Sequence, residues 1–184
     1  QSICGKKSAS AVIAKGLIVP AIETPEEVRL LVKYAKFTPV GSRGYAPTRD
    51  GRWNLEELTA DGIAAYMKQQ NQETLLLPQC ETLGCLEHLD EIVSIDGVDG
   101  IFVGPLDLSI AMGIPMKLDD PRMQDAILHI LQTCKKYGKL AAIYCNDANA
   151  AKKYAAMGFD SVTIGLDLLC LANVYRGIAA EMHR

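Results

Sequence analysis

The sequence predicts an α/β protein built on a parallel sheet. Three observations support this prediction. Strand-like and helix-like segments alternate with short connections, the strand-like segments are continuous apolar runs, and the connections contain helix-capping residues. Continuous apolar runs are typical of strands covered on both faces, and this alternation is typical of βαβ units. We count five such units and no linker, so residues 1–184 are expected to form a single domain.

The first unit is a strand over residues 16–22 followed by a helix. Thr24 is expected to cap this helix, with Pro25 at its first position and Glu27 completing a capping box. The helix should bury one apolar face, made of Val28, Leu31, Val32 and Ala35.

The second and third strands are predicted over residues 74–81 and 99–104. Residues 39–54, before the second strand, are too rich in Gly and Pro for regular structure, and a helix is expected over 55–70. A further helix, over residues 82–94, should connect the second strand to the third.

The last two strands are predicted over residues 139–145 and 161–166. Asp120 opens the helix before the fourth strand, and a helix from Asp147 is expected to end at Gly158. The apolar face of the first of these helices comprises Met123, Ile127, Ile130 and Cys134. The closing helix presents Leu171, Tyr175, Ile178 and Met182.

Length and charge exclude several classes of protein. The chain has 184 residues, 49% of them hydrophobic and 22% charged, which excludes a disordered, collagen-like or coiled-coil chain. A net charge of −3 without a Lys/Arg run argues against a nucleic-acid partner. No apolar run approaches the ~20 residues of a membrane span, and the N-terminus lacks the apolar core of a signal peptide. Without an initiator Met, the chain is expected to be a processed, tagged or incomplete product.

The six cysteines predict a reduced protein. No two form a C-x-x-C pair, and none has a His at zinc spacing. Most lie in apolar runs, so we expect buried thiols without disulfides, and therefore a cytoplasmic protein. The cysteines are Cys4, Cys80, Cys85, Cys134, Cys145 and Cys170.

A short motif that occurs twice in the sequence places carboxylates at the ends of two strands. Residues 20–24 and 78–82 share the pattern P-x-x-E-T, each between a strand and a helix. Their glutamates, Glu23 and Glu81, are therefore expected at the carboxyl edge of the sheet, where α/β folds place their chemistry. Glu23 has no partner carboxylate on the next element, which favours a capping or supporting role.

The second of these glutamates has a candidate partner. Residues two apart in a strand point to the same side, so Gln79 and Glu81 should face one way and Cys80 the other. Asp107 follows the next strand and should emerge at the same edge. Two carboxylates without His or Cys make a hard oxygen site that suits Mg²⁺ or Mn²⁺. The alternative is that Asp107 caps a turn and Glu81 opens a helix.

The sequence gives weaker evidence for a functional role of the other polar and aromatic residues. Arg43, in a G-x-R-G turn, could bind a carboxylate or phosphate in two-pronged fashion, or form a structural salt bridge. Ser109 is expected to cap the turn at residues 110–112. Trp53 could line a substrate mouth or pack beneath its loop. No histidine is a credible general base, and three are expected at the surface: His88, His129 and His183.

At this point the motifs resemble a known family. The resemblance is to the HpcH/HpaI aldolases of 2-keto-3-deoxy sugar acids and 4-hydroxy-2-oxo acids, which are related to the citrate lyase β subunit. It runs in order from about residue 16, and its most specific pair of motifs is Q-x-E-T with GPxDLS. The matching runs are GLIVPAIETPEE, VGSRGYAPTR, LLPQCET, GVDGIFVGPLDLSIAMG, AIYCND and FDSVTIGLD.

The resemblance implies a (β/α)8 TIM barrel that binds a divalent cation, Mg²⁺ or Mn²⁺, and cleaves aldols to pyruvate and an aldehyde through an enolate. It implies that Glu81 and Asp107 hold the metal. It also implies that Gln79 contacts the substrate and that the pyruvate carboxylate lies against backbone at Leu106 and Asp107. A homo-oligomer, dimer to hexamer, with an exchanged C-terminal helix is implied as well.

The chain also departs from the family. Its five units resemble the last five of the eight in a complete barrel, and residues 1–15 match poorly. The segments that carry the family's acid/base histidine and its enolate-stabilising arginine are not found. Arg43 does not match that arginine but stays a candidate catalytic residue. A truncated, catalytically silent paralogue is the alternative. A CoA-thioester lyase is less supported, because no basic CoA-binding stretch is visible.

Overall fold

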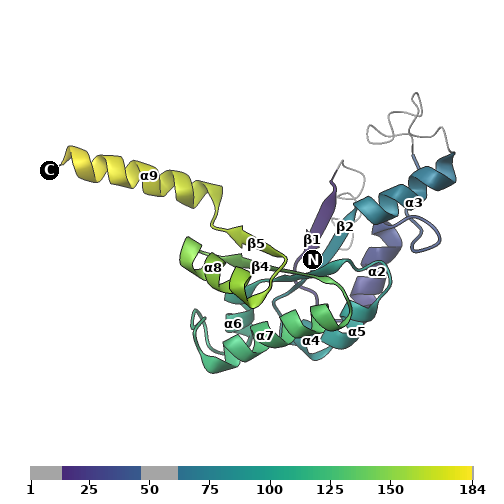
Figure 1. Ribbon diagram of the computed structural model, residues 1–184, viewed down its shortest axis with the longest axis horizontal. Helices are drawn as coiled ribbons and strands as arrows, with labels where there is room; N and C mark the ends of the chain where they lie inside the picture. The colour runs from purple at the N-terminus through teal and green to yellow at the C-terminus, as the bar shows by residue number, and fades with distance from the viewer. Residues whose placement is uncertain (1–13, 47–61, 184) are drawn as a thin grey trace.

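A computed structural model describes residues 14–46 and 62–183 of the protein (Figure 1). Five strands form one sheet in the order β1-β2-β3-β4-β5, and every neighbouring pair is parallel. This is a parallel α/β half-barrel, and it confirms the predicted class. The strands are β1 Gly16–Val19, β2 Leu75–Cys80, β3 Gly100–Val103, β4 Leu140–Cys145 and β5 Ser161–Ile164.

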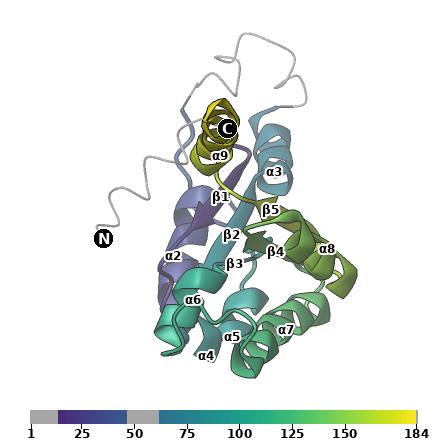
Figure 2. The same cartoon turned by 90° about the vertical axis from the view of Figure 1, so that its left-hand side faces the viewer.

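Helices connect the strands, and most of them cover one face of the sheet (Figures 1 and 2). The large apolar core lies between this face and the helices, and it includes the predicted apolar faces of α2 and α7. The helices are α2 Pro25–Ala35, α3 Ile63–Glu73, α4 Leu83–Glu87, α5 Leu89–Ser94, α6 Pro105–Ala111, α7 Pro121–Lys136, α8 Ala148–Met157 and α9 Asp167–Met182.

The opposite face of the sheet carries a second, smaller apolar cluster. Leu77, Phe102 and Ala142 are buried there, and Tyr144 packs against them. These residues occupy alternate positions along β2, β3 and β4, so they share one side of the pleat. In a closed barrel this side would face the interior.

The predicted helix caps are confirmed. Thr24 and Glu27 form both hydrogen bonds of the capping box at the start of α2. Asp120 and Asp147 cap α7 and α8 through hydrogen bonds to backbone N–H groups. Gly158 ends α8 in the left-handed conformation that favours glycine.

Several expected boundaries are wrong. The helix expected over 55–70 continues to Glu73 as α3, which starts at Ile63, while residues 55–61 lie outside the described part of the chain. The helix expected over 82–94 is two short helices, which meet at His88. Residues 110 and 111, expected in a turn capped by Ser109, belong to helix α6.

The thiols are mostly buried, as predicted. Cys80, Cys85, Cys134 and Cys145 are buried without disulfides, whereas Cys170 is exposed on α9. Burial raises the pKa of the Cys134 thiol to about 11, which keeps it protonated and unreactive. Cys4 and Trp53 lie outside the described residues.

Helix α9 projects away from the rest of the chain (Figure 1). None of its residues is buried, so its long apolar side chains are exposed within the described part of the chain. They are Leu168, Leu169, Leu171, Val174, Tyr175, Ile178 and Met182. Within the described residues, no helix is both long enough and apolar enough to cross a membrane.

Candidate metal centre

The carboxyl edge of the sheet brings the predicted acidic residues together. Glu81 directly follows β2, and Asp107 lies in the first turn of α6, which follows the neighbouring strand β3. Gln79 contacts Glu81 on one side of β2, while Cys80 lies in the large core on the other side. The alternation inferred from the sequence is therefore present in the structure.

Two hydrogen bonds hold the carboxylate of Glu81. Its Oε1 accepts the backbone N–H of Ala21 at 2.8 Å, and its Oε2 accepts the side-chain amide of Gln79. Only 8% of Glu81 is exposed. Donors of this kind offset the cost of burying a charged carboxylate, so Ala21 and Gln79 orient the two oxygens.

Asp107 is exposed and lies close to Glu81. Burial raises the pKa of Glu81 above its ordinary value, and the nearby charge of Asp107 raises it further. The donors from Ala21 and Gln79 oppose this shift. Two carboxylates that repel one another are stabilised by a cation between them.

The donor set therefore fits a hard divalent ion. Mg²⁺ is commonly held by one or two carboxylates, and waters and substrate oxygens complete its shell. Within residues 14–46 and 62–183, no group of three or more His, Cys, Asp or Glu side chains is placed to hold a metal. Glu81 and Asp107 form a pair, which suits an ion that shares its shell with a substrate.

Gly104 makes room for this pair of carboxylates. A Cβ at Gly104 would lie 2.6 Å from Nε2 of Gln79 and 2.8 Å from Oε2 of Glu81. We expect Gly104→Ala to push both groups aside and to weaken Mg²⁺ or Mn²⁺ binding by about 10–100-fold, measured by isothermal titration. Gly16→Ala is the matched control, because its Cβ would meet only ordinary contacts, the nearest at 3.5 Å. Equal affinities in the two variants would contradict this role of Gly104.

The two P-x-x-E-T segments interlock at this edge. Besides the bond from Ala21 to Glu81, the Thr82 hydroxyl donates to the Ile22 carbonyl at 2.5 Å. A Cβ added at residue 84 would lie only 2.3 Å from Oε2 of Glu23. Gly84, which has no side chain, therefore allows the Glu23 carboxylate to lie against the backbone of residue 84. Glu23 therefore supports this contact, whereas Glu81 faces Asp107.

Ala21 adopts a strained backbone in order to make its bond. Its φ is +54°, a left-handed conformation that costs a non-glycine residue roughly 1 kcal/mol. We therefore expect Ala21→Gly to leave the free energy of unfolding unchanged or to raise it by up to about 1 kcal/mol. Ala155→Gly, at an exposed position of α8, should instead lower it by about 1 kcal/mol. Chemical denaturation measures both, and a loss in Ala21→Gly as large as in the control would contradict the strain.

Two more predicted residues lie nearby. Leu106 is half-buried beside Asp107, and its carbonyl accepts the Ser109 hydroxyl at 2.6 Å. Ser109 is buried and also accepts the Met116 N–H at 3.0 Å, so it braces α6 and the following loop from inside the helix. His88, His129 and His183 are all exposed, as predicted.

Arg43 lies at the opposite end of the sheet. Its backbone N–H donates to the Lys36 carbonyl at 2.9 Å, and its guanidinium lies over the Phe37 ring, 4.7 Å from the centroid. The Lys36 side chain contacts Thr74 and Asp99, which precede β2 and β3. The structure therefore does not bring Arg43 to Glu81 and Asp107.

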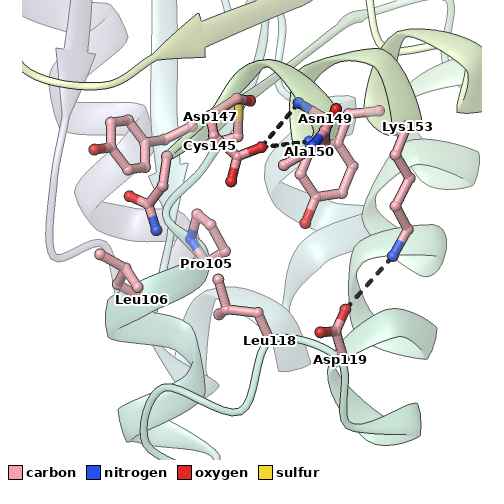
Figure 3. A pocket seen from close by; sticks show the side chains of 12 residues that line it. Pro105, Leu106, Leu118, Asp119, Cys145, Asp147, Asn149, Ala150 and Lys153 are labelled. Carbon is pink, nitrogen blue, oxygen red and sulfur yellow. Dashed lines mark hydrogen bonds and ion pairs between the residues drawn. The ribbon is translucent and has the colours of Figure 1, made fainter.

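A pocket whose lining includes Leu106, the residue before Asp107, opens near the candidate metal centre, and Figure 3 shows the side chains that line it. It has a volume of about 370 Å³ and lies between the start of α6, the end of β4 and the start of α8. Our reading of the sequence missed its polar residues, although Asn146 and Asp147 follow a predicted strand directly. Its lining includes Leu106, Asp119, Tyr144, Asn146, Asp147 and Lys153.

Comparison with known proteins identifies the family. Residues 2–174 match the family model described as HpcH/HpaI aldolase/citrate lyase. The chain belongs to this family. It is 38% identical over 167 residues to a hydroxypyruvate/pyruvate aldolase of Deinococcus radiodurans, covering 90% of this chain and 58% of that protein. It is 36% identical to a 4-hydroxy-2-oxo-heptane-1,7-dioate aldolase of Klebsiella pneumoniae, covering 91% and 62%.

A solved structure supports the fold. The chain is similar to an HpcH/HpaI aldolase/citrate lyase family protein from Burkholderia cenocepacia, with a TM-score of 0.84 at 26% identity. That likeness covers 97% of this chain and 68% of the other. The chain thus spans about 60% of the length of the curated relatives it matches.

Proposed function

We propose that the protein is a divalent-metal-dependent aldolase that cleaves a 2-keto-3-deoxy or 4-hydroxy-2-oxo acid to pyruvate and an aldehyde. The observation that carries this proposal is the position of Glu81 and Asp107 at the carboxyl ends of the neighbouring strands β2 and β3, with Glu81 oriented by Gln79 and Ala21. The relatives, named as aldolases that act on pyruvate-type acids, support it.

Glu81 and Asp107 would hold Mg²⁺ or Mn²⁺. The ion, when bound, supplies Lewis-acid chemistry at the keto oxygen of the substrate. Gln79, whose amide donates to Glu81, would meet the substrate, and the backbone at Leu106 and Asp107 would bind the carboxylate of pyruvate. These roles place the reacting acid over the end of β2 and the first turn of α6.

Cleavage breaks the bond between C3 and C4 of the oxo acid. The electron pair of this bond passes to C3, the C4 hydroxyl loses its proton, and C4 becomes the carbonyl carbon of the aldehyde. C3 then takes up a proton to give pyruvate. The described histidines are exposed and make no hydrogen bond to Glu81, so none of the three is placed to accept this proton.

The half-barrel would be part of a (β/α)8 barrel, with residues 1–184 contributing one partial barrel domain. The cluster of Leu77, Phe102 and Ala142 on the uncovered face would then line its interior. The exposed apolar residues of α9 support a homo-oligomer, dimer to hexamer, in which this helix packs on a second copy. Sedimentation velocity of the full chain tests this, and a monomer at micromolar concentration would contradict it.

Pyruvate release tests the function directly. The full chain is incubated with the oxo acid and Mg²⁺ or Mn²⁺, and pyruvate is measured with and without a chelator. Metal-dependent pyruvate supports the proposal, and metal-independent release contradicts it. A chain that binds the ion without cleaving any oxo acid would instead favour the catalytically silent paralogue that serves as an assembly partner.

A further inference from the structure

The pocket beside the candidate metal centre has the size of a small-molecule site. Its volume of about 370 Å³ lies within the range of roughly 300–1,000 Å³ found for ligand pockets. Leu106 lines it and directly precedes Asp107, while Tyr144 lines it and also packs on the uncovered face of the sheet. The pocket therefore adjoins the position where the oxo acid would be cleaved.

The pocket offers hydrogen-bonding groups that the fold does not use. In the described part of the chain, no hydrogen bond involves the side chains of Tyr144 or Asn146, although both line the pocket. Asp147 uses one oxygen, Oδ1, to accept the backbone N–H groups of Asn149 and Ala150 at 2.8 and 2.9 Å (Figure 3). Its other oxygen stays available. A phenol, an amide and a carboxylate are groups that bind hydroxyls.

The charges in the pocket disfavour an anionic ligand. Asp119 and Asp147 are negative, and Lys153 is the cation among the lining residues. The Lys153 ammonium donates to Oε1 of Gln124 at 2.8 Å and lies 3.9 Å from the Asp119 carboxylate. It is therefore engaged on the protein itself, and a second carboxylate on a ligand would meet two acidic groups without a dedicated partner.

We propose that this pocket receives the hydroxylated chain of the aldehyde half of the substrate. This inference rests on the proposed function and deepens it. It selects sugar-derived oxo acids over dicarboxylic ones, although one relative is named for a heptane-1,7-dioate. Hydroxyl groups on the carbons beyond C4 would donate to Asp147 and Asn146 and accept from Tyr144, in place of pocket water.

The first test is binding, which needs no turnover. Erythritol, a neutral four-carbon polyol, and succinate, a dianion of similar length, are titrated into the full chain labelled with ¹⁵N. We expect erythritol to shift the backbone amide resonances of Tyr144, Asn146 and Asp147, and succinate to shift them less. Shifts that are absent, or larger with succinate, would overturn the proposal.

The second test is selectivity among substrates. We expect Asn146→Ala and Tyr144→Phe each to lower the ratio of kcat/KM for a 2-keto-3-deoxy sugar acid to that for 4-hydroxy-2-oxo-heptanedioate by about tenfold. Gln72→Ala, at an exposed position of α3, should leave this ratio unchanged. An unchanged ratio in both pocket variants would overturn the inference while the aldolase function stands. If no substrate releases pyruvate, the proposed function fails, and the erythritol titration still decides whether the pocket selects hydroxyl groups.

Discussion

Glu81→Gln and Asp107→Asn are each expected to lower metal-dependent pyruvate release by about 10³-fold. Each change removes one of the two negative charges that would hold the divalent ion while keeping the size of the side chain. The affinity for the divalent cation should fall together with the rate of pyruvate release, because Mg²⁺ binds amide oxygens more weakly than carboxylates. Pyruvate release and isothermal titration with Mg²⁺ and Mn²⁺ measure the two effects separately.

The fold should tolerate both changes. A glutamine at position 81 keeps an oxygen that can accept the Ala21 N–H. Burial raises the pKa of Glu81, so the folded state favours its protonated form. The raised pKa of Glu81 stabilises the folded state at pH values below the pKa that this carboxyl has in the unfolded chain. This stabilisation is lost as the pH rises through the higher pKa of the folded state. Glu81→Gln should therefore raise Tm at pH 7 relative to the natural chain, and raise it less at pH 4.

Matched controls separate a site effect from a general charge effect. Glu87→Gln on α4 and Asp96→Asn before β3 remove exposed carboxylates elsewhere. Both should keep the affinity for Mg²⁺ and the rate of pyruvate release. Full activity in Glu81→Gln and Asp107→Asn, or an equal loss in the controls, would refute the assignment of the metal centre.

Local signals predicted the fold well. The strand runs are mostly apolar, which favours a parallel sheet covered by helices, and Thr24, Asp120 and Asp147 identify helix starts that the structure contains. The break at His88 was missed, because residues 82–94 have helical composition throughout. Such a break is set by packing on the sheet rather than by local propensity.

The candidate metal centre was predictable because a strand has a period of two. Once Gln79 and Glu81 share a side and Asp107 follows the neighbouring strand, their proximity follows from a parallel sheet alone. Arg43 lies away from this centre for a related topological reason. It follows α2, and a chain that has run down a connecting helix has returned to the amino end of the sheet.

The amino end of the sheet also contains a buried lysine, Lys36, whose burial is not evident from the sequence. Lys36, at the end of α2, reads as an exposed basic residue near a helix C-terminus, yet it is 1% exposed. Its ammonium donates to Asp99 Oδ2 at 2.7 Å and to the carbonyls of Thr74 and Asn71 at 2.5 and 2.9 Å. Asp99 also accepts the Leu76 N–H at 2.7 Å. One ion pair thus joins α2, α3, β2 and β3.

Lys36→Met is expected to lower the free energy of unfolding by about 3–5 kcal/mol. The change leaves the largely buried Asp99 carboxylate without its cation and two backbone carbonyls without a donor, and each such group is costly when unpaired. Lys33→Met is the control, since Lys33 is exposed on the same helix, and it should change stability by less than about 0.5 kcal/mol. Urea denaturation measures both.

The double variant Lys36→Met with Asp99→Asn tests whether the loss comes from the unpaired charge. Asparagine keeps an oxygen for the Leu76 N–H but carries no charge, so the double variant should recover part of the stability that Lys36→Met loses. Because the pair lies at the amino end of the sheet, away from Glu81, Mg²⁺ affinity should not change in the folded double variant. A double variant less stable than Lys36→Met would show that packing, rather than the buried charge, dominates at this position.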